Sequence, residues 1–410
     1  MKKIFALFLL CFIFIFCVAL SSCNGINKTG AICAKGHVYE DKICKNCGSL
    51  KPSEGLNFRS NGDGTCYVLG VGTCRDSDVV IPARSPAGDI VTSIGERAFF
   101  WNTNITSILI PNSVRTIEER AFNYCYNLET ITLGKGVKSI GENAFSSCKN
   151  LTSIDIPDSV ITIGVGAFSS CKSLTSVNIS NSVTNIDSAA FYFCTGLTSI
   201  EIPDSVINIG DSAFYYCTSL ESITFGNSIT RIGNKAFWNC TSITFINIPD
   251  SVTDIGKEAF SKCENLETVT IGNGLKSIKS SAFTWCTNLT DITVDSRNPH
   301  YLSENGVLYN KNKTSLVQFP AGKKVSSFAI PSGVTNIEDY AFYYCTNIEC
   351  INIPDSVTNI GYESFCGCSN IEEITYNGTK SQWRNIHKGY YWNFFVGTYT
   401  THCIDGNIQS

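Results

Sequence analysis

Four side chains near the N-terminus have the types and the spacing of a metal-binding set. Cys33, His37, Cys44 and Cys47 follow the pattern C-x3-H-x6-C-x2-C, and Gly48 comes directly after the last cysteine. Three thiolates and one imidazole form a common tetrahedral ligand set for zinc and fill all four positions of the ion. The spacing therefore predicts a structural zinc site without an open position for water. A pair of disulfides is the alternative in an oxidising compartment.

The first residues of the chain indicate such a compartment. Lys2 and Lys3 precede an apolar run over residues 4–20, and two serines then stand before Cys23. This arrangement resembles a bacterial lipoprotein signal, and the resemblance implies cleavage before Cys23 and a lipid on its thiol. An uncleaved membrane anchor is the alternative. Either reading places the rest of the chain outside the cytoplasm, and we expect a lipid-anchored protein at the outer surface of a bacterial cell envelope.

The composition excludes some classes of partner. The chain has 410 residues, a formal charge of -4, 16% charged residues, 11% aromatic residues and 21 cysteines. This length is too great for one ordinary core and fits several domains or one long repeat array. The negative charge, without a basic patch, argues against nucleic acid as a partner.

A 23-residue unit repeats along the chain. One unit reads C-x-x-L-x-x-I-x-I-P-x-x-V-x-x-I-G-x-x-A-F-x-x. A unit this short cannot bury its own apolar face, whereas a stack of such units can. The period therefore predicts a solenoid. Its clearest markers are the cysteines Cys125, Cys148, Cys171, Cys194, Cys217, Cys240, Cys263 and Cys286.

The pattern inside one unit predicts its elements. In the unit that opens at Cys148, residues 151–156 alternate at their end as a strand does, and Pro157 then stops the strand. We expect neighbouring turns to pair these strands into one parallel sheet on a concave face. Residues 160–163 form a second short extended piece. Ala167-Phe168 is expected on one helical or 3-10 turn, with the phenylalanine in the core. The expected fold is a β-rich α/β repeat solenoid, a horseshoe.

The array extends beyond the perfect run of cysteines. Asn102 holds the cysteine position one period before Cys125, and Cys345 and Cys368 follow after a turn that is longer by 13 residues. We count twelve turns. The residue at the ninth offset alternates between proline and glycine or serine, which indicates an older unit of 46 residues: Pro111, Gly134, Pro157, Ser180, Pro203, Gly226, Pro249 and Gly272.

Six segments follow from these observations. They are a lipoprotein signal peptide (1–22), a tether (23–32), a small zinc-ribbon-like module (33–48), an N-terminal cap (49–97), a leucine-rich-repeat solenoid (98–376) with an inserted turn near 298–320, and a C-terminal cap (377–410).

The repeat resembles the BspA-type leucine-rich-repeat family of bacterial surface proteins. The resemblance covers roughly residues 56–400 and includes the insertion with Gly306-Val307-Leu308-Tyr309 and the tail with Trp383 and Ile386. It implies a curved solenoid. Its functional implication is weaker, because the family is defined by its scaffold. Some members resemble adhesins for host matrix proteins or for other cells.

The repeated cysteines are expected to be structural. Each should be a small buried residue whose thiol makes a weak hydrogen bond to the backbone of the next turn. Asn102 at the same position can also make a hydrogen bond to the backbone but cannot do redox chemistry, which favours the structural role. Cys66 and Cys74 flank a segment that looks like a hairpin, and they could form a disulfide across it.

No pattern of catalytic residues accompanies the repeat. The chain has no nucleophile elbow, zinc-protease motif, phosphate loop or dinucleotide fingerprint, so we expect a protein without enzymatic activity. A site around His300 in the inserted turn is the remaining enzymatic hypothesis. The segment Asn61-Gly62-Asp63-Gly64 resembles half a calcium loop, and we interpret it as a hairpin turn.

Two surfaces are candidates for binding. The outward strand positions, such as Thr152, Ser153 and Asp155, form a polar ribbon on the expected concave sheet. The two positions after the core phenylalanine are often aromatic and should line one edge of the solenoid, where rings can anchor a partner. Stacking between neighbouring turns is the alternative. These aromatic residues are Phe100, Trp101, Tyr192, Phe193, Tyr215, Tyr216, Trp238, Trp285, Tyr343 and Tyr344.

The most specific functional hypothesis is a cell-surface adhesin or receptor that binds an extracellular protein or glycan. A structural or self-associating envelope protein without a specific ligand is the alternative.

Overall fold

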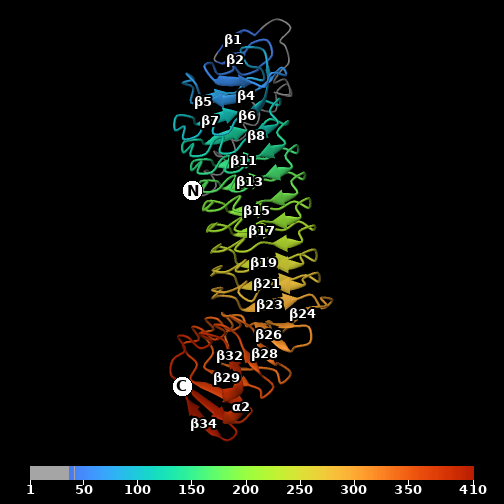
Figure 1. The fold of residues 1–410 in the computed structure, drawn as a ribbon, viewed down its shortest axis with the longest axis vertical. Helices are drawn as coiled ribbons and strands as arrows, with labels where there is room; N and C mark the ends of the chain where they lie inside the picture. Colours follow the sequence, from blue (N-terminus) through green and yellow to red (C-terminus); the bar gives the residue numbers. More distant parts are fainter. Residues whose placement is uncertain (1–36, 41) are drawn as a thin grey trace, which may run out of the picture.

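The computed structural model describes residues 37–40 and 42–410, which form an elongated column of stacked turns (Figure 1). The column has about fifteen turns with a period of about 23 residues and almost no helix. Segments that follow one another in the sequence also lie next to one another along the column. The predicted repeat solenoid is therefore confirmed.

The longest sheet is built from the second short segment of each unit. This segment contributes two residues to most strands, and its isoleucine points into the core, as where Ile140 pairs with Ile163 in the next turn. The pairing is parallel from β4 onward, and one antiparallel strand closes the N-terminal edge. Its strands are β3 (Asn57–Ser60), β4 (Thr65–Gly70), β6 (Ile90–Ile94), β8 (Thr116–Ile117), β10 (Ser139–Ile140), β12 (Thr162–Ile163), β14 (Asn185–Ile186), β16 (Asn208–Ile209), β18 (Arg231–Ile232), β20 (Asp254–Ile255) and β22 (Ser277–Ile278).

The first strand of each unit was predicted to form one continuous sheet, and that prediction is wrong. These strands form a series of short sheets instead. The sheets are β5 (Asp78–Val80), β7 (Ser107–Leu109) and β9 (Thr130–Thr132); β11 (Ser153–Asp155) and β13 (Ser176–Asn178); β15 (Ser199–Glu201) and β17 (Ser222–Thr224); β19 (Phe245–Ile248), β21 (Thr268–Ile271) and β23 (Asp291–Val294); and β27 (Ser327–Ala329), β29 (Cys350–Ile353), β31 (Glu373–Tyr376), β33 (Thr400–Cys403) and β34 (Gly406–Gln409).

The breaks in the central part of this series follow the 46-residue unit. They separate β9 from β11, β13 from β15 and β17 from β19, each time before a turn with proline. Proline has no N–H to donate to the preceding turn. Where Asp295 replaces the proline, its N–H donates to the carbonyl of Ile271 at 2.8 Å and the sheet continues. The two turns of one 46-residue unit pack closely at this position. A Cβ added to Gly226 would lie only 2.4 Å from the carbonyl oxygen of Pro203 in the turn before.

The Ala-Phe segment is a run of tight turns rather than the expected helical or 3-10 turn. Two residues in most of these segments have a positive φ, for example Arg120 (53°) and Tyr124 (63°), and this interrupts helical geometry. The N–H of Phe122 consequently donates to the next turn, at the carbonyl of Ala144, while the N–H of Cys125 donates within its own turn. The core phenylalanines stack face to face along the column, with Phe191 and Phe214 centroids 5.3 Å apart.

The inserted segment divides the apolar interior into two clusters. It forms the antiparallel strands β24 (Tyr301–Glu304), β25 (Val307–Asn310) and β26 (Ser315–Gln318). The long sheet ends at β22, and a second sheet starts at β24 and continues through β28 (Asn336–Ile337), β30 (Asn359–Ile360) and β32 (His387–Lys388). Most of the buried residues before the insertion belong to one core cluster and those after it to another.

The array is longer than the twelve turns expected, because its end turns lack the marker residues. Near the C-terminus, the N–H groups of Phe365 and Gly367 still donate to the carbonyls of Trp392 and Phe394, as in a normal turn. There Val396 stands in the register position of cysteine. The helix α2 (Lys380–Asn385) precedes this last turn. In the described residues, no helix is both long and apolar enough to span a membrane.

The N-terminal end is closed by β3 and β4, whose turn contains Asn61 to Gly64. Asp63 accepts hydrogen bonds from the N–H and the hydroxyl of Thr65. This confirms the interpretation of that segment as a hairpin turn.

Candidate functional site

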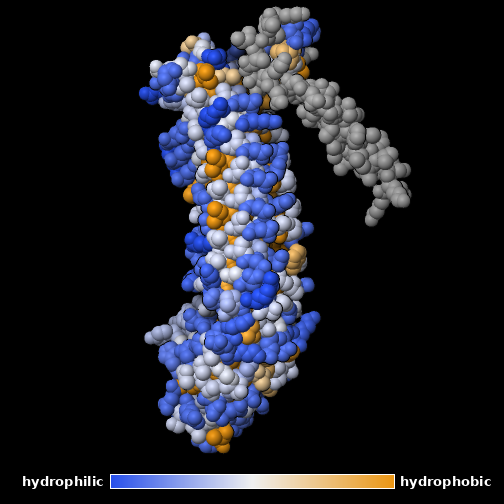
Figure 2. All heavy atoms as spheres, turned by 90° about the vertical axis from the view of Figure 1, so that its right-hand side faces the viewer, coloured by the Kyte–Doolittle hydropathy of each residue, from blue (hydrophilic) through white to orange (hydrophobic). Residues whose placement is uncertain are grey.

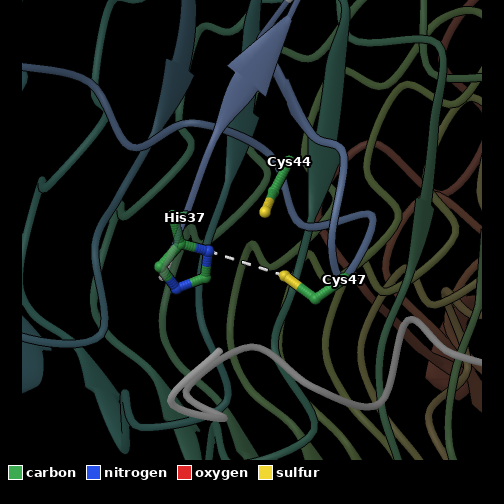
Figure 3. A group of neighbouring side chains, drawn as sticks. All are labelled: His37, Cys44 and Cys47. Carbon is green, nitrogen blue, oxygen red and sulfur yellow. Dashed lines mark hydrogen bonds between the residues drawn. The ribbon is translucent and has the colours of Figure 1, made fainter. Parts of the chain in front are cut away.

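His37, Cys44 and Cys47 lie together around a small hairpin (Figure 3). The hairpin consists of β1 (Tyr39–Glu40) and β2 (Ile43–Cys44), which pair antiparallel. One potential ligand atom from each of the three residues lies within 4.8 Å of the others, and Sγ of Cys47 is 3.5 Å from Nδ1 of His37. Cys33, the fourth predicted ligand, and Cys23, the predicted lipidation site, lie outside the described residues.

The turn after β2 favours a charged sulfur at Cys44. Burial raises the pKa of this thiol, but hydrogen bonds from the Asn46 N–H, from His37 and from Cys47 outweigh burial and lower the pKa to about 6. Gly48 has a φ of 71° and donates its N–H to the Cys44 carbonyl at 2.7 Å, which closes the knuckle. The group could therefore hold a metal ion.

The cysteines of the repeat are buried thiols. Each one donates to the phenylalanine carbonyl of the preceding turn, for example from Cys194 Sγ to the Phe168 oxygen at 3.1 Å. Burial raises the pKa of Cys171 and of Cys217 to about 12, so these thiols stay protonated in neutral solution. The structural interpretation of the cysteines is confirmed, with the bonds running to the turn before.

Asn102, at the register position of the cysteines, makes different hydrogen bonds. Its Oδ1 accepts from the N–H groups of Asn104 and Ile105 within its own turn, at 2.9 and 3.3 Å. The prediction of a hairpin between Cys66 and Cys74 is wrong, because Cys66 lies within β4, which pairs with β3 and β6. Both thiols are free, and that of Cys66 lies 3.7 Å from the Asp89 carbonyl oxygen.

The ten aromatic residues predicted above, called here the aromatic edge, lie beside the phenylalanine stack. Those from Tyr192 to Trp238 stack between neighbouring turns while remaining partly exposed. Tyr215 is centred 4.8 Å from Tyr192 and 4.5 Å from Trp238, and Phe193 lies 4.5 Å from Tyr216. Inter-turn stacking, the alternative left open by the sequence, is therefore present in the central part of the edge.

Lys262 connects the central part of the aromatic edge to its C-terminal part. Its Nζ lies 4.8 Å from the Trp238 ring and 5.7 Å from the Trp285 ring, which is cation–π distance. Trp285 in turn contacts Tyr344 at 4.1 Å and Tyr343 at 5.4 Å between ring centroids. The edge is thus one connected series of rings from Tyr192 to Tyr344.

Phe100 and Trp101 form a separate group near the N-terminal end. Trp101 is 58% exposed and contacts Tyr124 and Tyr126 at 5.2 and 6.1 Å. Tyr124 is not among the predicted aromatic residues, although it occupies the register position of Trp101 one period later. Phe395 of the last turn, which is 66% exposed, is also absent from that set, because its turn lacks the cysteine that marks the register.

The polar ribbon lies on the short sheets, where it lines a cavity of about 540 Å³. The exposed side chains of Asp155, Asn178 and Glu201 face this cavity together with serine and threonine hydroxyls. The face shown in Figure 2 is mostly hydrophilic and carries its apolar residues in small separate patches. His300 is exposed in the loop before β24.

Comparisons with known proteins agree with this geometry. Residues 92–220, 185–314 and 318–394 match the BspA type leucine rich repeat region. A leucine-rich repeat protein from Bacteroides ovatus has 27% identity and a TM-score of 0.58, over 86% of this chain and 98% of that one. A leucine rich cell surface protein from Faecalibacterium prausnitzii has 28% identity and a TM-score of 0.47, over 82% and 96%.

No curated protein matches the chain. The family match covers well over half of the residues, and its proteins are typically binding proteins without catalysis. The chain belongs to the BspA-type leucine-rich-repeat family.

Proposed function

We propose that the protein is a cell-surface binding protein that presents its solenoid to an extracellular protein or glycan. One observation carries this proposal: aromatic rings from consecutive turns form a connected edge that is still partly exposed. Rings held in place by their neighbours lose little conformational entropy when a partner binds, which makes them good anchors. The solenoid supplies many such positions in one register.

The edge is tested with a matched variant. Ser169 and Ser170 fill the positions of Tyr215 and Tyr216 two turns earlier, so the double variant Tyr215→Ser/Tyr216→Ser suits the local backbone. We expect it to lose most binding to arrays of extracellular matrix proteins and glycans. A control variant, Ile161→Ser, changes an exposed residue on the long sheet and should bind normally. If wild type binds nothing on either array but sediments as an oligomer, the structural alternative replaces this proposal.

We also propose that lipid on Cys23 anchors the protein to the cell envelope. The apolar run before Cys23 and the small residues next to it support this reading. Cys23→Ala should move the protein out of the membrane fraction or leave its signal uncleaved. A Cys23→Ala protein that is cleaved, acylated and membrane-bound would contradict the anchor.

The third element of the proposal is a structural zinc ion held by Cys33, His37, Cys44 and Cys47. A short N-terminal module cannot form a core alone, and metal binding would supply its folding energy. Elemental analysis of the full chain should give one zinc per molecule, and Cys47→Ser should lose it. Cys350→Ser, at a half-buried cysteine far along the chain, is the control. Disulfides among these cysteines without bound metal would refute the zinc site.

A further inference from the structure

A second candidate site lies on the same edge, near the N-terminal end of the array. A cavity of about 500 Å³ opens there to solvent between three successive turns. This volume suits a single small ring and its substituents. The residues that matter are Arg97, Phe100, Arg120, Asn123 and Tyr124.

Aromatic rings form one wall of this cavity. The rings of Phe100 and Tyr124 meet edge to face, with centroids 5.7 Å apart at 82°. Trp101 lies beside them, 5.2 Å from Tyr124. Two rings at this angle form an apolar corner, in which one ring can pack on the C–H face of a sugar while the other contacts its edge.

Two arginines contribute positive charge from equivalent register positions. Arg97 and Arg120 are one period apart, and both have a φ of 53°. Arg97 Nη1 lies 3.6 Å from Glu96 and Arg120 Nη1 lies 2.8 Å from Glu119, and these are their ion pairs within the described residues. Because a guanidinium has five N–H donors, several remain for a carboxylate ligand.

An independent observation points to a ligand with hydroxyl groups. Asn123 is only 5% exposed and lines the cavity, and its Nδ2 donates to the Asn143 carbonyl at 3.4 Å. Its Oδ1 has no hydrogen-bond partner among the described residues. A buried acceptor without a partner is unfavourable. Almost none of this oxygen is accessible to solvent, so the Asn123 side chain must turn toward the cavity before a ligand hydroxyl can donate to it and remove that cost.

We propose that this cavity binds a sugar residue that carries a carboxylate, as part of a glycan. The arginines hold the carboxylate, Asn123 Oδ1 accepts from a hydroxyl, and Phe100 and Tyr124 pack on the ring. An acidic peptide would satisfy the arginines but would not need the aromatic wall together with a buried acceptor. The inference rests on the proposed function and specifies the class of ligand for one end of the edge.

The test compares two sugars that differ only in the carboxylate. The full chain is titrated with methyl β-glucuronide and with methyl β-glucoside, and intrinsic tryptophan fluorescence and saturation-transfer NMR report binding. We expect the glucuronide to bind at least about tenfold more tightly, since charge-assisted hydrogen bonds to two arginines are strong. Equal affinity for the two sugars, or tighter binding of a glutamate-rich peptide, would overturn the proposal.

The repeat supplies matched variants for this site. Asn143 occupies the same register position as Arg97 and Arg120 with a φ of 52°, so Arg97→Asn/Arg120→Asn keeps a compatible backbone. We expect this variant to lose the preference for the glucuronide. Asn123→Ser, copied from Ser146, should weaken binding of both sugars. Lys235→Asn, at the equivalent position in a distant turn, should leave binding unchanged.

These outcomes separate the two proposals. If Tyr215→Ser/Tyr216→Ser still prefers the glucuronide as the wild type does, the sugar site in the cavity is supported. This holds even if the array experiment shows no binding by the central part of the aromatic edge. An unchanged preference in Arg97→Asn/Arg120→Asn would show that the arginines do not read the carboxylate and would refute the inference.

Discussion

At the scale of single residues, the register position decides what a side chain does. Phe214 is fully buried and stacks between Phe191 and Phe237, whereas Tyr215, one residue later, is only partly buried. Tyr216 then adopts a φ of 63°, which turns the chain back toward the core at Cys217. Three adjacent residues therefore serve the core, the edge and the turn.

The sequence predicts these tasks where the marker residues are intact. The cysteines and phenylalanines are buried as expected, because a 23-residue period leaves few ways to place their small and large apolar volumes. Asn102 was harder to predict, since an amide can accept within its own turn as well as donate to another. The cavity at Asn123 depends on side chains from three turns and has no signature in any one of them.

Our first prediction compares the core with the edge. Phe214→Ala should lower the free energy of unfolding of its region by about 3–5 kcal/mol, the usual range for a buried phenylalanine. Tyr215→Ser/Tyr216→Ser removes three stacked pairs between turns, worth together about 1.5–4.5 kcal/mol, but it opens no buried cavity and should cost less than Phe214→Ala. Thermal melts of both variants test this. Equal destabilisation by the two variants would mean that the edge rings are core residues.

The second prediction concerns thiol reactivity. A thiol whose pKa lies above the solution pH stays protonated and reacts slowly with iodoacetamide. At pH 8, after treatment with a chelator, the native protein should be labelled at Cys44, whose pKa is lowered to about 6. Cys171 and Cys217, with pKa values raised to about 12, should react only after unfolding. Peptide mass spectrometry reads the sites, and rapid native labelling of Cys171 would contradict its burial.

At the scale of elements, the sequence predicts strands better than sheets. The strand at Ser153–Asp155 follows directly from the alternation of residues. In the central turns the short sheets break before each turn with proline, for example between β13 and β15, where Pro203 has no N–H to donate. The long sheet was underestimated for a related reason, since two residues such as Thr162–Ile163 are too short to show a period.

The third prediction concerns the helix α2. The hydroxyl of Thr379 accepts from the N–H of Gln382, and the Gln382 side chain accepts from the N–H of Thr379, so this helix has a capping box. Thr379→Ala should destabilise the C-terminal region by about 0.5–2 kcal/mol. Hydrogen exchange around the buried Trp383 measures the effect. Thr379→Ser keeps the hydroxyl and should behave like wild type; if it exchanges as fast as the alanine variant, the cap is not what stabilises the helix.

At the scale of the whole molecule, the interior is divided at the inserted strands β24 to β26. One core cluster contains the phenylalanines from Phe99 to Phe283, and the other contains Phe319, Phe342 and Phe365. In a solenoid each turn contacts only its neighbours, so cooperativity weakens wherever the stack is interrupted. The division is visible in the sequence only as a turn of unusual length.

The fourth prediction follows from this division. We expect unfolding in at least two steps, with Phe342→Ala lowering only the stability of residues after the insertion. Phe168→Ala should lower only the stability of residues before it. Calorimetry together with hydrogen exchange of each segment resolves the two steps. One sharp transition that shifts equally with either substitution would show that the two clusters unfold as a unit.

The alternation of proline turns with glycine or serine turns also bears on how such a gene can change its length. The 46-residue unit is encoded by 138 base pairs. Unequal recombination that adds or removes this length keeps the alternation of proline turns with glycine or serine turns. Like turns stand together in this chain at Pro82 and Pro111 and at Pro331 and Pro354, outside the regular alternation, whereas a gain or loss of half that length would interrupt the alternation itself. Relatives of this protein should therefore differ in length mainly by even numbers of turns, and the two ends of the aromatic edge would move apart in steps of two.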